Sequence, residues 1–161
     1  MERIAVFPGS FDPFTIGHES IVKRALPLFD KIVIAVGQNV SKSSFLPLDK
    51  RLEWIREIFM QEPKVEVYPY KGLTVDFCRQ VKARYILRGL RTAADFEYER
   101  AVGQVNKALD AEIETVYLLT DPQYSFINST MVREIIRNGG DANIFLPHSN
   151  SMREYLKNFK G

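Results

Sequence analysis

Short apolar runs alternate with amphipathic stretches along nearly the whole chain, and this alternation limits the possible folds more than any other feature. The apolar runs predict buried strands at residues 3–7, 31–36, 64–68, 84–87 and 114–119. Apolar residues at helical spacing predict helices at residues 17–29, 48–61, 74–82, 95–109, 129–137 and 152–159. Alternation of strands and helices predicts an α/β fold: a Rossmann-like, doubly wound, five-stranded parallel sheet in a single domain.

Length and composition set the broad class of the protein. With 161 residues and no composition break, the chain is expected to form one domain, 1–161, with its C-terminal helix at about 149–160. The net charge of +2 argues against a nucleic-acid partner, and no apolar run approaches the roughly 18 residues of a membrane span. A single cysteine, Cys78, excludes an internal disulfide and indicates a reducing compartment, so we expect a cytoplasmic protein.

The loop after the first predicted strand has the composition of an anion site. It runs from Pro8 to His18 and is rich in Gly, Pro and Ser, which lets backbone N–H groups approach a phosphate. Gly17 and His18 fall at the start of a predicted helix, whose N-terminus favours negative charge. In the simpler interpretation Ser10 or Thr15 merely caps that helix and His18 packs or faces solvent. Both interpretations are compatible with the spacing alone.

Four separated motifs resemble those of one enzyme family. Thr15-Ile16-Gly17-His18 resembles the (H/T)xGH signature of the nucleotidylyltransferase superfamily. The chain as a whole resembles the bacterial phosphopantetheine adenylyltransferases, in the same order along the sequence, through 7–13 (FPGSFDP), 86–91 (ILRGLR), 95–99 (DFEYE) and 125–130 (SFINST).

This resemblance implies a reaction and its partners. It implies transfer of AMP from ATP to 4′-phosphopantetheine, with Mg²⁺, giving dephospho-coenzyme A and pyrophosphate, by a homohexameric enzyme. The nucleophile is the phosphate of the substrate, which is already anionic, so the enzyme needs no general base and forms no covalent intermediate. No cluster of His or carboxylate residues has the spacing of metal ligands, so we expect phosphate oxygens and water to hold the Mg²⁺.

The resemblance also implies roles for individual residues. The catalytic residues would be His18, Ser10, Lys42 and Arg91. The acceptor substrate would be bound by Ser10, Lys42, Thr74 and Arg88. ATP would be bound by Ser10, Phe11, His18, Gly89, Leu90, Arg91, Glu99, Tyr124, Ser125, Phe126, Ile127, Asn128, Ser129 and Thr130. Relatives usually have Trp at the position of Tyr124 and Leu or Met at that of Thr74.

Two other functions remain open, and several residues have a simpler structural assignment. The chain could be another adenylyl- or cytidylyltransferase of the superfamily, because the Gly17-His18 turn is shared across it. It could also be a non-catalytic nucleotide-binding module on the same fold. His148 and Cys78 are expected to be a surface histidine and a small core residue. Asn128 to Thr130 would also serve as an ordinary helix cap.

Overall fold

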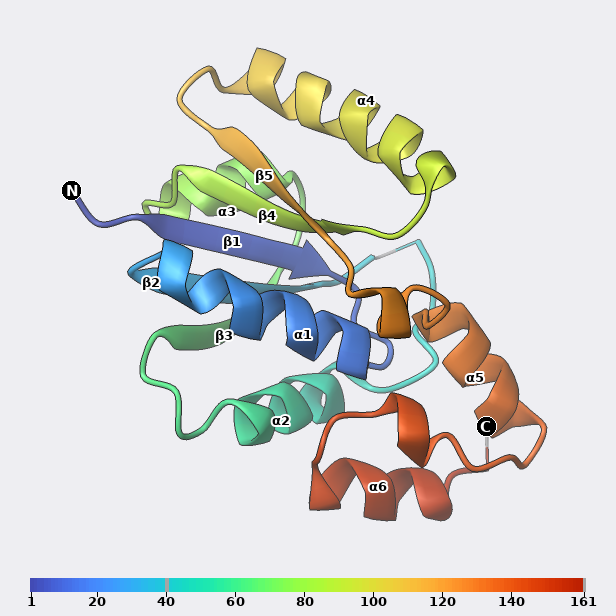
Figure 1. Ribbon diagram of the computed structural model, residues 1–161. Coiled ribbons are helices and arrows are strands. Elements are labelled where there is room, and N and C mark those ends of the chain that lie inside the picture. Colours follow the sequence, from blue (N-terminus) through green and yellow to red (C-terminus); the bar gives the residue numbers. More distant parts are fainter. Residues whose placement is uncertain (40, 161) are drawn as a thin grey trace.

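The computed structural model, which describes residues 1–39 and 41–160, contains one five-stranded parallel sheet (Figure 1). Its strands lie in the order β3-β2-β1-β4-β5, and every pair of neighbours is parallel. The strands are β1 (Ile4–Gly9), β2 (Lys31–Gly37), β3 (Val65–Tyr70), β4 (Tyr85–Leu90) and β5 (Glu114–Leu119). The expected Rossmann-like α/β fold is confirmed.

Within the described residues, six α-helices connect or follow the strands, in the order expected from the sequence. They are α1 (Ile16–Ala25), α2 (Leu48–Ile58), α3 (Thr74–Gln80), α4 (Ala93–Leu109), α5 (Ser129–Arg137) and α6 (Asn150–Lys157). The first helix is shorter than the expected 17–29, because Pro27 has no backbone N–H and the chain tightens into a 3₁₀ turn at Leu26–Leu28.

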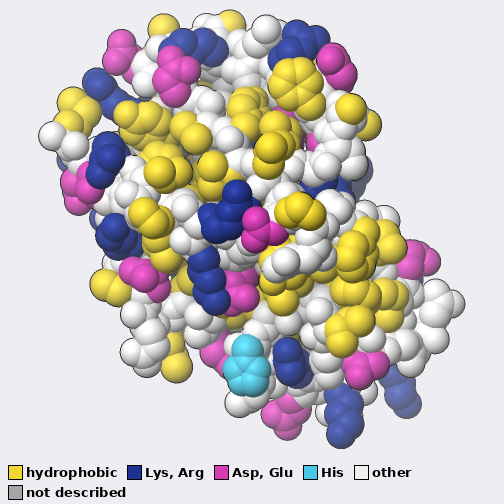
Figure 2. Space-filling view, viewed as in Figure 1, with side chains coloured by type: hydrophobic (Ala, Val, Ile, Leu, Met, Phe, Trp, Pro, Cys, Tyr) yellow, Lys and Arg dark blue, Asp and Glu magenta, His cyan; other side chains and the backbone are white. Residues whose placement is uncertain are grey.

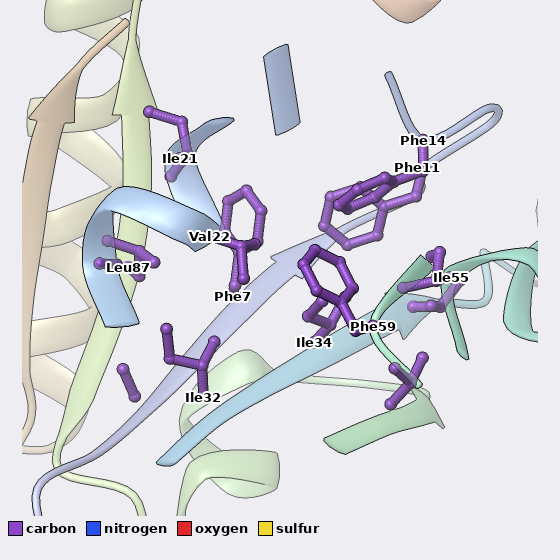
Figure 3. Packing of buried hydrophobic residues seen from close by; sticks show 14 of the residues in the cluster. Phe7, Phe11, Phe14, Ile21, Val22, Ile32, Ile34, Ile55, Phe59 and Leu87 are labelled. Carbon is purple, nitrogen blue, oxygen red and sulfur yellow. The ribbon is translucent and has the colours of Figure 1, made fainter. Parts of the chain in front are cut away.

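Helices cover both faces of the sheet, which makes it doubly wound. On one face α1 and α2 pack against alternate residues of the strands, and Figure 3 shows Phe7, Ile32 and Ile34 of the sheet among their side chains. On the other face α3 packs against the residues of opposite parity, such as Val6 and Val33. Cys78 lies buried in this second core, as expected.

The C-terminal part of the chain lies at one end of the sheet. Trp54 and Leu46 are buried against α5 and α6 in a third apolar cluster, together with Val132 and Met152. Figure 1 shows α5 on the side of the carboxyl end of β1 and α6 next to α2. This cluster fixes the start of α5 at the sheet edge where an α/β fold binds its ligands. His148 is exposed, as expected.

Two strands are longer at their carboxyl ends than the sequence predicts. β1 includes Pro8 and Gly9, and β4 continues past Leu87 to Leu90. The predicted ends are wrong because β2 pairs with β1 as far as Gly9 and β5 pairs with β4 as far as Leu90. The pairing of β1 with β4, in contrast, ends at Val6. A proline is tolerated at position 8 because that stretch of β1 has no ladder bond to β4. The strands separate there, which opens a crevice at the switch point of the sheet.

Candidate active site

Two adjoining cavities occupy this crevice at the carboxyl ends of β1 and β4. The first, about 390 Å³, we name the His18 cavity; the loop before α1, the end of β4 and the start of α5 line it. The second, about 480 Å³, we name the Thr74 cavity; it extends over α4 and the loop before α3. Both are lined by Pro8, Gly9, Ser10, Arg88 and Glu99, so a ligand in one cavity can meet a ligand in the other there.

Most of the residues expected in the site line these cavities. Those along the His18 cavity are Ser10, Phe11, His18, Gly89, Arg91, Glu99, Tyr124, Ile127, Asn128, Ser129 and Thr130. Thr74 lines the second cavity, and Ser10 and Arg88 line both.

Four expected residues do not line either cavity. Lys42 is exposed on the loop between β2 and α2. Leu90 is the last residue of β4, and the hydroxyl of Ser125 donates to the carbonyl of Pro122 (2.9 Å). Phe126 is 57% exposed, with its ring 6.2 Å from that of Phe145. Their roles in ligand binding stay predictions.

The start of α1 combines helix capping with presentation of His18. The backbone N–H of Thr15 donates to His18 Nδ1 (2.9 Å), and the N–H of His18 donates to Thr15 Oγ1 (3.4 Å). The capping interpretation is therefore confirmed, although His18 also lines the cavity. Because Nδ1 accepts a hydrogen bond, the proton of the neutral ring lies on Nε2, which leaves an N–H donor for a ligand.

The surroundings of His18 keep its imidazole uncharged. Burial, followed by the positive charges of Arg88 and Arg91, lowers the pKa of His18 from 6.5 to about 3. The rings of Phe11 and Phe14 lie 5.0 and 5.2 Å from its own. At neutral pH His18 is therefore uncharged, and its Nε2–H is a neutral hydrogen-bond donor.

Phe11 belongs to the core beneath the loop. Its side chain is only 4% exposed and its φ is +49°, a conformation that turns the backbone sharply. A Cβ on Gly9 would lie 2.8 Å from the Phe11 ring, so only glycine permits this close packing. A contact of Phe11 with ATP would therefore involve mainly its backbone.

Arg88 crosses the gap between β4 and β1. Its Nε and Nη2 donate to the two carboxylate oxygens of Glu99 (3.0 and 2.6 Å), and Nη1 donates to the carbonyl of Pro8 (2.6 Å). Burial opposes the charge of Arg88, but the bonds and charge of Glu99 outweigh it and raise the pKa of Arg88. One N–H on each Nη atom remains for a ligand. The contact of Glu99 with the nucleotide stays a prediction, and both of its carboxylate oxygens accept from Arg88.

The start of α5 presents further donors to the same cavity. Asn128 caps the helix by accepting from the N–H of Met131 (2.8 Å), which confirms the capping interpretation. Ser129 Oγ donates to the carbonyl of Pro13 (2.8 Å) and holds the helix end against the first loop. Arg91, paired with Asp95, reaches the carbonyl of Ile127 through Nη1 (3.4 Å). Backbone N–H groups at a helix N-terminus are suited to binding phosphate.

The charges around the His18 cavity balance. Three arginines line it, Arg88, Arg91 and Arg133, together with three carboxylates, Asp12, Asp95 and Glu99. Among residues 1–39 and 41–160 no group of three or more His, Cys, Asp or Glu side chains could hold a metal ion. The cavity therefore has directed hydrogen-bond donors but little excess positive charge.

The sequence interpretation missed three polar residues at the site. Asp12 and Arg51 are buried under the loops, and Arg133 Nη1 donates to the carbonyl of Asp12 (2.8 Å). A signal for Arg51 existed, since it lies four residues before Ile55 on the apolar face of α2. A charged residue at such a position is rarely buried without partners.

Comparisons with known proteins identify the family of this chain. The cytidylyltransferase-like family matches residues 6–135. The phosphopantetheine adenylyltransferase of Flavobacterium psychrophilum is 50% identical over 147 residues, 91% of this chain and 97% of the relative. That of Bacteroides fragilis is 46% identical over 150 residues, 93% of this chain and 99% of the relative.

Solved structures support the fold. A putative nicotinate-nucleotide adenylyltransferase from Vibrio parahaemolyticus matches with a TM-score of 0.72, over 98% of this chain and 100% of that one. Its sequence is only 19% identical, so this likeness concerns the fold alone. The relatives match at 46–50% identity over nearly their whole length. The chain belongs to the phosphopantetheine adenylyltransferase family of cytidylyltransferase-like enzymes.

Proposed function

We propose that this protein transfers the AMP moiety of ATP to the phosphate of 4′-phosphopantetheine, reversibly, giving dephospho-coenzyme A and pyrophosphate, a step of coenzyme A biosynthesis. The family supports this reaction through the names of its members. The observation that carries the proposal is the meeting of two cavities at Ser10 and Arg88. The His18 cavity is lined by hydrogen-bond donors that suit the phosphates of ATP, and the Thr74 cavity extends away from them. The reaction requires this arrangement, because the acceptor phosphate must reach the α-phosphorus of ATP.

The chemistry needs only positioning and charge stabilisation. The acceptor phosphate, bound by Ser10, Arg88 and Lys42, attacks the α-phosphorus of ATP in line, and pyrophosphate leaves. His18 donates from Nε2, and Arg91 and the α5 N-terminus donate to the phosphate oxygens on which charge develops. These donors are fixed before the substrates bind, so little reorganisation is needed. The pantetheine arm would lie in the Thr74 cavity.

A divalent cation fits the balanced charge of the cavity. ATP and the acceptor bring several negative charges to a site where three arginines already face three carboxylates. Asp95 and Glu99 are engaged by Arg91 and Arg88, so Mg²⁺ would be held mainly by phosphate oxygens and water. When bound, Mg²⁺ would neutralise charge on the triphosphate. Arg88 and Arg91 would donate hydrogen bonds to the same phosphates and so orient them.

Assembly and location belong to the same proposal. We expect a homohexamer, as the resemblance implies, and large apolar side chains on α4 and β5 are available for contacts between copies. Val105 is 58%, Leu109 48% and Leu119 72% exposed, and Figure 2 shows hydrophobic side chains gathered over this part of the surface. None of the helices among the described residues has the length and apolarity needed to span a membrane. Separately, the single cysteine remains the basis for expecting a cytoplasmic enzyme.

Pyrophosphate release tests the proposal. The protein is incubated with ATP, Mg²⁺ and one acceptor at a time: 4′-phosphopantetheine, nicotinamide mononucleotide or a polyol phosphate. We expect release with phosphopantetheine only, and dephospho-coenzyme A as the second product. Preference for another acceptor would identify a different nucleotidyltransferase, and ATP binding without turnover would identify a non-catalytic module.

A further inference from the structure

Arg51 is a buried cation that the proposed chemistry does not use. It lies on α2, is only 3% exposed, and donates to three acceptors. Nη1 donates to the carbonyl of Ser10 (2.6 Å), Nε to the carbonyl of Leu46 (3.1 Å) and Nη2 to Ser44 Oγ (3.0 Å). A buried arginine that donates from one element to two loops holds those loops at a fixed distance from each other.

Asp12 makes the complementary contacts from the opposite direction. It belongs to the same loop as Ser10 and is 7% exposed. Its two carboxylate oxygens accept from the backbone N–H groups of Phe45 and Leu46, at 2.8 Å each. The negative charge of Asp12 also acts on Arg51, because it opposes the lowering of the Arg51 pKa by burial. The backbone at Leu46 is therefore held through both its N–H and its C=O.

These contacts join the two loops that carry the expected acceptor ligands. Ser10 lies in the loop after β1, and Lys42 lies in the loop after β2, two residues before Ser44. The bonds from Asp12 to Phe45 and Leu46 span 33 and 34 residues of sequence. Each loop leaves backbone polar groups that need partners away from water. Arg51 and Asp12 satisfy those groups and also set the distance between the loops.

We propose that Arg51 and Asp12 are positioning residues, which hold the Ser10 loop and the Lys42 loop at the separation that binds the acceptor phosphate. The proposal rests on the proposed function for the identity of that phosphate. ATP depends less on the two residues, because Arg91 and the start of α5 also bind it and neither is held by Arg51. Loss of Arg51 should therefore affect the two substrates unequally.

Steady-state kinetics of Arg51→Gln compares the effect of the substitution on the two substrates. We expect KM for phosphopantetheine to rise between about 10-fold and about 100-fold, with KM for ATP within about threefold of wild type. Arg51→Lys keeps the buried charge with fewer donors and should give a smaller rise. The matched control is Arg56→Gln: Arg56 is also on α2 and donates to a backbone carbonyl, that of Val67 (2.8 Å), away from the cavities. Equal rises for both substrates, or a similar rise in the control, would overturn the proposal.

Limited proteolysis provides a readout that does not depend on activity. Trypsin can cleave after Lys42, which is exposed. Under native conditions, cleavage there should be at least about 10-fold faster in Arg51→Gln and Asp12→Asn than in Arg56→Gln, relative to cleavage at other sites. Unchanged cleavage would overturn the proposal even if activity falls. If the wild type proves inactive with phosphopantetheine, the proposed function fails, and proteolysis still decides whether Arg51 and Asp12 hold the loop. If Arg51→Gln does not fold, Arg51→Lys and Asp12→Asn are tested in the same two assays.

Discussion

Replacing His18 with glutamine should make the fold less sensitive to acid. The folded protein lowers the pKa of His18 to about 3 through burial and the charges of Arg88 and Arg91. In the unfolded chain the pKa returns to roughly 6.5. Between about pH 3 and pH 6.5 the unfolded state therefore binds one more proton than the folded state. Stability contributed by the neutral imidazole is complete above this range and is lost as the pH falls through it.

The size of the effect follows from that pKa difference. One pKa unit corresponds to about 1.4 kcal/mol, and the unfolded imidazole becomes almost fully protonated between pH 7 and pH 5 while the folded one does not. The free energy of unfolding should fall by about 2 kcal/mol over this interval because of His18 alone. Since its side chain is partly accessible, we expect about 1 to 2 kcal/mol, or roughly 2 to 8 °C in Tm.

Urea unfolding at pH 7 and pH 5 checks this prediction. The matched control is His148→Gln, because His148 is exposed and is the other of the two histidines. Wild type and His148→Gln should each lose about 1 to 2 kcal/mol more than His18→Gln between the two pH values. The comparison uses the change with pH, so any baseline loss of stability in a variant does not affect it. An equal loss in His18→Gln and wild type would show that the folded protein does not keep His18 neutral.

Four further outcomes are expected. His18→Ala should keep the fold, checked by circular dichroism, and lower kcat by about 10²-fold, since it removes one donor where charge develops; a rate within about threefold of wild type would contradict this. Lys42→Ala and Arg88→Ala should weaken phosphopantetheine much more than ATP in calorimetric titrations, and loss of ATP affinity alone would show that the substrates are wrongly assigned. Glu99→Gln should lower the free energy of unfolding by about 2 to 3 kcal/mol, because the partly buried Arg88 loses a charged acceptor, whereas Glu97→Gln, in an exposed ion pair, should cost less than about 1 kcal/mol; equal losses in urea unfolding would refute the difference. Turnover at saturating substrates should vary weakly between about pH 7 and 9, and it should disappear with excess chelator. A steep rise in turnover over that pH range, removed by one side-chain variant, would indicate a general base.

Local sequence patterns were enough to predict the elements of this fold. The expected strand at 114–119 and helix at 129–137 match β5 and α5 residue for residue. The errors concern the ends of strands, which depend on pairing with the adjacent strands of the sheet. The strands expected at 3–7 and 84–87 end too early, because pairing with β2 extends β1 to Gly9 and pairing with β5 extends β4 to Leu90. Such pairing is a contact between distant segments, which a local pattern does not contain.

In the candidate site, too, the sequence predicted the residues that have local signatures and missed the contacts that depend on packing. Motifs identified Ser10, His18 and Arg88, because a turn at a helix start and a cation after a strand have local signatures. The bidentate bond between Arg88 and Glu99 was not predicted, although the two residues are only eleven apart. It requires α4 to lie over the end of β4, which depends on how the helix packs.

The sequence by itself determined the order of strands and helices, the family and the identity of most residues that line the cavities. Only the tertiary structure decided the strand order, the separation of β1 from β4 and the burial of Arg51. It also placed Arg51 against the carbonyl of Ser10, 41 residues away. The physical reason is that hydrophobic period and capping residues act within a few positions of the chain. The partners of a buried charge are set by which distant segments the core brings together, where an unpaired charge would be costly.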